Sequence, residues 1–312
     1  LDVYVSLADV AVRNNYVCPE VDASDAIVIK DGRHPVVEKF LKNEMFVPND
    51  VNLNESERLM LITGPNMAGK STYMRQTALI ILMAQIGSFV PASSARIGVV
   101  DKLFTRIGAS DDLAAGQSTF MLEMTECAYI LKNATARSFI LYDEIGRGTS
   151  TFDGMSIARA IIEYTVSKKL YAKTMFATHY HELTELEDLC RGVVNYNIVA
   201  KKRGDELIFL RKIVRGAADE SYGIEVAKLA GVPDEVVKRA GKILASIDEH
   251  APVDPKKNLL PKTDGGIATL GLETIVYDKV CEDIKRLDVN TLTPIEALGK
   301  LYEMKKILEG AE

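Results

Sequence analysis

A glycine-rich loop between an apolar run and a helical pattern constrains this chain more than any other feature. The segment GPNMAGKS at 64–71 fits the pattern G-x-x-x-x-G-K-[ST]; it follows the apolar run LMLIT at 59–63 and precedes a predicted helix over 70 to about 86. Successive backbone N–H groups of such a loop point at phosphate oxygens, and the positive end of the helix dipole adds to the attraction. The sequence therefore predicts a nucleotide-phosphate site where a buried strand ends.

The side chains of this loop have distinct expected roles. Lys70 is expected to reach the β- and γ-phosphates, Ser71 to coordinate Mg²⁺, and Thr72 to reach the α-phosphate of ATP or ADP. The alternative is a chance match in a turn before a helix, and the strand and helix on either side argue against it. The predicted nucleotide-binding residues of the loop are Gly64, Pro65, Asn66, Met67, Ala68, Gly69, Lys70, Ser71 and Thr72.

Two adjacent carboxylates close a second apolar run, FILYD at 139–143. Hydrolysis of a nucleotide needs an Asp for the Mg²⁺ shell and a carboxylate that orients and deprotonates water, so Asp143 is the predicted metal residue and Glu144 the predicted base. Successive strand residues point to opposite sides, so both can face one phosphate only if the strand ends here. The turn at 146–148 provides the bend; the alternative is an exposed acidic pair that caps a helix.

Two further segments fit the same site. His179 directly follows a third apolar run, TMFAT at 174–178, where it could sense the γ-phosphate or the attacking water; His181 fits a cap of the next helix instead. Ser118 and Thr119 open a predicted helix in GQSTFMLEM, where backbone N–H groups and hydroxyls favour an anion. Taken alone, that segment is equally an ordinary N-cap before an apolar helix face.

The spacing of the short apolar runs predicts buried parallel strands separated by long helices, which is an α/β fold. The net charge is −6 over 312 residues, so no general basic surface indicates binding to nucleic acid. The four cysteines form no CxxC pair, which argues against zinc and disulfides. No signal peptide and no apolar run of 18 residues is present, so a cytoplasmic protein without a membrane partner is expected.

Four motifs together resemble the ATPase domain of the MutS family of DNA mismatch-repair proteins, a branch of the ABC-type ATPases. They are TGPNMAGKSTYMRQT, STFMLEMTE, DEIGRGTSTFDG and FATHYHEL, and the transporter-type LSGGQ signature is absent. The resemblance covers about residues 1–249 and implies a mixed, largely parallel sheet flanked by helices. It also implies a homodimer that pairs head to tail, in which Lys70, Glu144 and His179 act together with Ser118 contributed by the other subunit.

The resemblance implies further contacts around the nucleotide. Phe46 lies where the family has an aromatic that stacks on adenine, although a buried core aromatic is the alternative. Arg211 lies where some relatives carry a second side chain against the base. Asn66 and the loop around Arg147, Thr149 and Ser150 are expected near the composite site, and His34 lies upstream in the same lobe with no assigned role.

The expected domain organisation follows the same resemblance. Residues 1–215 would be the ATPase domain, with 1–20 the remnant of an upstream helical region; 216–249 a helix-turn-helix that dimerises; 250–266 a linker; and 267–312 a small helical oligomerisation segment of bacterial type. The amphipathic C-terminal helix could equally pack on its own domain. We expect a piece of a longer protein whose missing upstream domains read mismatched DNA and which works with a MutL-type partner.

The expected function is that of a Mg²⁺-dependent ATPase module that couples ATP state to mismatch search and to a sliding clamp. A recombination-associated relative of the same family remains an alternative, as does a dimerisation module that binds nucleotide without hydrolysing it. A P-loop kinase would also carry GKST, but Glu144 beside Asp143, together with His179, favours water as the nucleophile.

Overall fold

The computed structural model describes residues 1–41, 45–65, 68–108, 118–203, 206–217, 222–250 and 300. The chain forms two compact units, Leu1–Glu249 and His250–Glu312. Apart from the last residue of the final helix, every element below lies in the first unit. Among the described residues, none of the helices combines the length and apolar character needed to cross a membrane.

A six-stranded sheet forms the centre of the first unit. All neighbouring pairs are parallel except the edge pair β9–β10, which is antiparallel. β4 lies between β9 and β8 and is buried along its whole length, as expected for an apolar run covered on both faces. The predicted α/β fold with a mixed, largely parallel sheet is confirmed. The strand order is β10 (Glu206–Arg215), β9 (Val193–Arg203), β4 (Leu59–Thr63), β8 (Lys173–Ala177), β7 (Phe139–Asp143) and β6 (Leu103–Arg106).

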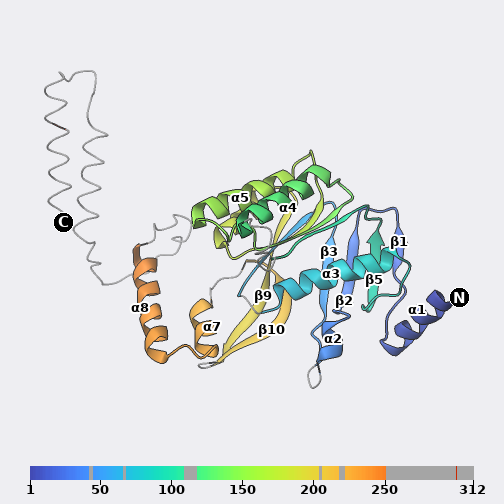
Figure 1. Ribbon diagram of the computed structural model, residues 1–312, viewed down its shortest axis with the longest axis horizontal. Helices are drawn as coiled ribbons and strands as arrows, with labels where there is room; N and C mark the ends of the chain where they lie inside the picture. The colour runs from blue at the N-terminus through green and yellow to red at the C-terminus, as the bar shows by residue number, and fades with distance from the viewer. Residues whose placement is uncertain are drawn as a thin grey trace, which may run out of the picture. The chain divides into compact units, whose positions relative to one another are not determined.

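Three long helices cover the two faces of this sheet: α3 (Lys70–Gln85) on one, α4 (Thr119–Asn133) and α5 (Thr151–Thr165) on the other (Figure 1). Alternate residues of β4 point to opposite faces. Met60 and Ile62 join a core with α3, whereas Leu59 and Leu61 join a core with α4 and α5. A continuous apolar run such as β4 therefore contributes side chains to both cores.

A second, four-stranded sheet packs in the α3 core and was not predicted from the sequence. Its strands contribute buried residues such as Ile29, Val51 and Ile97 to the same cluster as Ile80 and Ile81 of α3. Its order is β1 (Glu20–Asp22), β5 (Ser94–Gly98), β2 (Ile27–Gly32) and β3 (Asn49–Leu53), with helices α1 (Asp2–Arg13) and α2 (Val37–Phe40) before and within it.

The predicted helix-turn-helix is present as α7 (Gly223–Leu229) and α8 (Asp234–His250), joined through Gly231, which has φ 85°.

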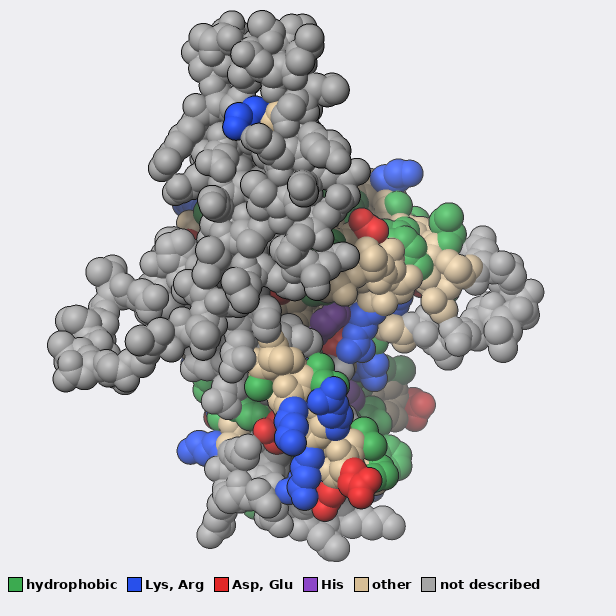
Figure 2. All heavy atoms as spheres, turned by 90° about the vertical axis from the view of Figure 1, so that its left-hand side faces the viewer, with side chains coloured by type: hydrophobic (Ala, Val, Ile, Leu, Met, Phe, Trp, Pro, Cys, Tyr) green, Lys and Arg blue, Asp and Glu red, His purple; other side chains and the backbone are tan. Residues whose placement is uncertain are grey.

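Lys and Arg side chains lie among Asp and Glu side chains on the described part of the face in Figure 2. Almost all of 251–312, where the linker and C-terminal helices were predicted, lies outside the described residues. Two short helices, η1 (His181–Glu185) and α6 (Leu186–Leu189), follow β8.

Candidate functional site

The predicted site residues gather where three neighbouring strands end. Ala177, the last residue of β8, pairs with Ile62 of β4 on one side and with Asp143 of β7 on the other. Glu144 continues this alignment, because its N–H donates to the Ala177 carbonyl at 2.9 Å. Since parallel strands bring their carboxyl ends to one edge, the phosphate loop, the acidic pair and the segment with His179 share this edge.

The phosphate loop holds its lysine inward. Gly64 and Gly69 adopt the left-handed region, with φ 124° and 112°, and a Cβ at position 64 would lie 2.8 Å from Ile198 Cγ2, so glycine is required there. The buried Lys70 Nζ donates to the carbonyls of Gly64 at 2.5 Å and Pro65 at 3.2 Å. Burial lowers the Lys70 pKa, and the charges of the acidic pair oppose that effect.

A polar cavity of about 290 Å³ opens beside this lysine. The phosphate loop and the start of α3 line one side, and the acidic segment after β7 lines the other. Two cations, a carboxylate and two hydroxyls therefore face one space, which suits phosphate groups and a divalent cation. The lining residues are Pro65, Gly69, Lys70, Ser71, Thr72, Glu144 and Arg147.

The two adjacent carboxylates differ in their surroundings. Asp143 Oδ1 is buried and has no hydrogen-bond partner among the described residues, whereas Glu144 Oε2 forms an ion pair with Arg147 at 2.5 Å. Glu144 has φ 56°, so the chain bends at this residue, before the predicted turn at 146–148. A buried acceptor without a donor fits a metal ligand.

The Mg²⁺ site predicted from the sequence fits this arrangement. Ser71 lines the polar cavity, and Asp143 offers the unpartnered oxygen. Within the described residues there is no cluster of three or more His, Cys, Asp or Glu side chains that could hold a metal. A site made of one carboxylate, one hydroxyl and substrate phosphates suits Mg²⁺, which rarely uses a complete protein cage.

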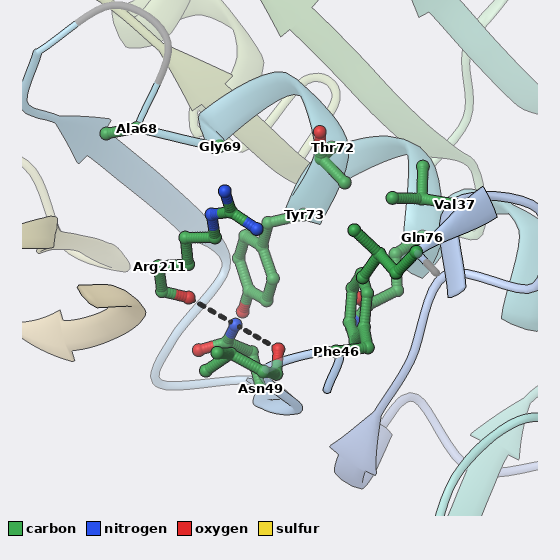
Figure 3. A pocket seen from close by; sticks show the side chains of 11 residues that line it. Val37, Phe46, Asn49, Ala68, Gly69, Thr72, Tyr73, Gln76 and Arg211 are labelled. Carbon is green, nitrogen blue, oxygen red and sulfur yellow. Dashed lines mark hydrogen bonds between the residues drawn. The ribbon is translucent and has the colours of Figure 1, made fainter. Parts of the chain in front are cut away.

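Phe46 and Arg211 line a second cavity, of about 320 Å³ (Figure 3). Phe46 precedes β3, and Arg211 lies in a bulge of β10 with φ 55°. Gly69 and Thr72 line both cavities, so the two are adjacent. An aromatic ring and a guanidinium in one cavity, with phosphate donors in the adjacent one, match the chemistry of a nucleotide. The lining also includes Val37, Leu41, Val47, Asn49, Ala68, Tyr73 and Gln76.

Asn49 was missed by sequence reasoning although it builds this second cavity. Its Nδ2 donates to the Arg211 carbonyl at 2.9 Å, and its Oδ1 accepts from the Ile213 N–H at 2.8 Å. Gln76 was missed as well; both of its amide atoms are buried without a partner among the described residues. No local pattern marks either residue.

His179 stands exposed just after β8, with its ring centroid 4.1 Å from that of Tyr180. Burial of part of the ring lowers its pKa below the ordinary 6.5, and the charges of Arg147 and Lys70, which line the polar cavity, lower it further. The capping role for His181 is wrong. η1 begins at His181 itself, and no side-chain hydrogen bond caps it.

Ser118 is the N-cap of α4, and its Oγ accepts from the Met121 N–H at 3.2 Å. Neither cavity includes it. Ser150 has the same capping role for α5, and His34 Nδ1 accepts from the N–H groups of Val36 and Val37, so both have local structural partners. Asn66 and Met67 lie outside the described residues.

The fold and the two adjacent cavities define the class: a P-loop nucleotide-binding α/β domain. Residues 60–248 match the family "MutS domain V", and residues 274–307 match "DNA mismatch repair protein MutS C-terminal region". The chain belongs to the MutS family and carries its ATPase domain.

Individual relatives agree with this membership. The chain is 56% identical to "DNA mismatch repair protein MutS" of Acetivibrio thermocellus, over 99% of the chain and 36% of that protein. It is 56% identical to the protein of the same name from Ruminiclostridium cellulolyticum, over 100% of the chain and 36% of the relative. The chain thus spans about a third of the length of the relatives it matches.

Proposed function

We propose that the chain is the ATP-binding and Mg²⁺-dependent ATP-hydrolysing module of a DNA mismatch-repair protein. The observation that carries this proposal is the pair of adjacent cavities, one lined by Phe46 and Arg211 and the other by Lys70, Ser71 and Glu144. In this proposal Phe46 and Arg211 hold the adenine, and the loop from Gly64 to Thr72 holds the phosphates.

The buried charges support hydrolysis as well as binding. Asp143 and Ser71 would hold Mg²⁺, which when bound neutralises charge on the phosphate oxygens. Glu144 orients the attacking water and takes its proton, while the ion pair with Arg147 holds the carboxylate in place. His179, with its lowered pKa, is neutral at pH 7 and contacts the γ-phosphate or the water through a hydrogen bond.

A head-to-tail homodimer would complete the site with Ser118 from the other subunit. Two observations support this: Ser118 lies outside the cavities of its own chain, and Met121 and Phe152 at the starts of α4 and α5 are 57% and 78% exposed. The helix-turn-helix of residues 216–249 would add to the dimer contact. In the dimer, Ser118 Oγ and the N–H groups of α4 would approach the γ-phosphate.

The wider role concerns a protein longer than this chain. Its ATPase domain would be 1–215, followed by the dimerising 216–249, a linker 250–266 and an oligomerising 267–312. ATP state would switch the full-length homodimer between mismatch search and a sliding clamp on DNA bound by upstream domains, and would recruit a MutL-type partner. A recombination-associated MutS relative would use the same module.

ATP hydrolysis by the purified chain, measured against its own concentration, tests this proposal. The specific rate should rise with concentration, because dimers form the site, and Glu144→Ala and Ser118→Ala should each abolish it. Mixing the two variants should restore about a quarter of the wild-type rate, because half of randomly paired dimers are mixed and each has one intact site. A rate independent of concentration and unchanged by Ser118→Ala would refute the shared site. ATP binding without turnover at any concentration would favour a nucleotide-binding dimerisation module.

A further inference from the structure

Gly146, in the segment that carries Glu144, contacts three neighbouring elements. The Gly146 N–H donates to Glu123 Oε1 at 2.6 Å, and the Gly146 carbonyl accepts from the Tyr180 hydroxyl at 3.0 Å. A Cβ at position 154 would lie 2.1 Å from the Gly146 oxygen, so α5 packs directly on this peptide. Gly146 cannot shift alone, and it lies two residues from Glu144.

Glu123 links this glycine to the helix of Ser118. Glu123 lies five positions after Ser118, the N-cap of α4, which corresponds to about 7.5 Å along the helix axis. A second contact joins the same two segments. Gly148 packs so closely on Phe120 of α4 that an added Cβ would lie 2.9 Å from the Phe120 Cβ. A displacement of α4 therefore reaches the Glu144 segment at two points.

Glu123 is a buried carboxylate with two specific polar partners, whereas packing alone would need only an apolar side chain. Its side chain is 7% exposed, and its two oxygens have different partners: Oε1 accepts from Gly146, and Oε2 pairs with the buried Arg106 at 3.3 Å. Arg106 also pairs with Glu126 Oε2 at 3.0 Å, so the guanidinium keeps a partner without Glu123. A buried carboxylate is costly, and a charge-assisted hydrogen bond to one backbone N–H gives firm positional control.

We propose that Glu123 is a positioning residue that couples the two nucleotide sites of the dimer. When Ser118 engages the nucleotide bound by the partner subunit, α4 moves, and the Glu123–Gly146 hydrogen bond carries this movement to Glu144 of the same subunit. Each site then hydrolyses ATP fastest when the other is filled. This inference rests on the proposed function, because it needs both Glu144 as base and Ser118 acting across the interface.

The first test is the ATP dependence of hydrolysis by the 312-residue chain. The wild type should show a Hill coefficient between 1 and 2, the limit for two sites. Glu123→Ala should bring the coefficient to 1 and lower kcat by about 100-fold, the effect of a misplaced base, with the ATP dissociation constant unchanged. Glu123→Gln should keep the cooperativity, because its amide oxygen still accepts from Gly146. Glu126→Ala is the matched control: it removes the other carboxylate on Arg106 and should also keep the cooperativity.

The second test uses mixed dimers to separate coupling from stability. Active subunits are mixed with a large excess of Lys70→Ala subunits, so that each active site faces a partner that binds no nucleotide. The hydrolysis rate per wild-type site should be lower in these mixed dimers than in the wild-type homodimer. The rate per Glu123→Ala site should be the same in the mixed dimers as in the Glu123→Ala homodimer. If pairing with Lys70→Ala subunits lowers both rates by the same factor, Glu123 has a purely structural role and the inference is overturned.

Two further outcomes are distinguishable. If Glu123→Ala does not fold, as judged by circular dichroism, Glu123→Asp replaces it. This variant keeps the charge but is one methylene shorter and so withdraws its oxygen from the Gly146 N–H, and it should lower the Hill coefficient; an unchanged coefficient in Glu123→Asp overturns the inference. Tyr180→Phe removes the other anchor of Gly146 and keeps the Glu123–Gly146 hydrogen bond, so it should keep a Hill coefficient above 1. A wild-type chain that hydrolyses ATP without cooperativity overturns the coupling alone. A wild-type chain that never hydrolyses ATP overturns the proposed function.

Discussion

Replacing Asn49 by alanine should destabilise the chain and weaken nucleotide binding together. Asn49 is 4% exposed and bonds the backbone of the β10 bulge on both sides of Arg211. Alanine would remove the hydrogen bonds to the Ile213 N–H and to the Arg211 carbonyl. Each such bond contributes about 0.5–1.5 kcal/mol net, so we expect a total loss of about 2 kcal/mol.

Urea denaturation followed by circular dichroism measures this loss. With a slope of about 2 kcal/mol per M, the midpoint should fall by about 1 M. Asn52→Ala is the matched control, because Asn52 lies on the same strand with its side chain exposed, and it should change stability by less than about 0.5 kcal/mol. ATP affinity should fall about tenfold in Asn49→Ala, because Arg211 loses the bond that fixes its left-handed backbone. A stability change no larger than that of the control would refute the importance of this clamp.

Two other substitutions test the buried contacts around the sheet. Burial raises the pKa of Asp25, but its hydrogen bonds and ion pairs with Lys173 and Arg58 outweigh this effect, so the pKa lies below the ordinary 3.8. The contribution of Asp25 to folding stability is therefore present above pH 3.8. It is lost as the pH falls through the folded-state pKa. Asp25→Asn, which leaves two buried cations without this partner, should cost about 1–2 kcal/mol at pH 7, allowing for the half-exposed carboxylate. In urea titrations this cost should shrink progressively as the pH is lowered below 3.8. Gly154→Ala should cost about 1–3 kcal/mol in the same assay, because its Cβ would lie 2.1 Å from the Gly146 oxygen; an unchanged midpoint would contradict that packing.

The sequence predicts well where the chemistry is local. The phosphate loop, the acidic pair and the strand before His179 are each marked by a few adjacent residues, and the structure brings them to one sheet edge. The second sheet was missed, because its short strands lack a strong pattern. Asn49 and Glu123 were missed because their partners are backbone groups of distant segments, and a backbone group leaves no trace in the sequence.

The hydrogen bond from Asn49 to Arg211 joins residues 162 positions apart. Bringing two residues so far apart in sequence together costs loop-closure entropy, so we expect this contact to form in the later steps of folding. The base cavity is thus assembled after the phosphate loop, whose glycines and lysine are neighbours in sequence. Nucleotide would consequently slow unfolding of the finished domain and leave its rate of folding unchanged.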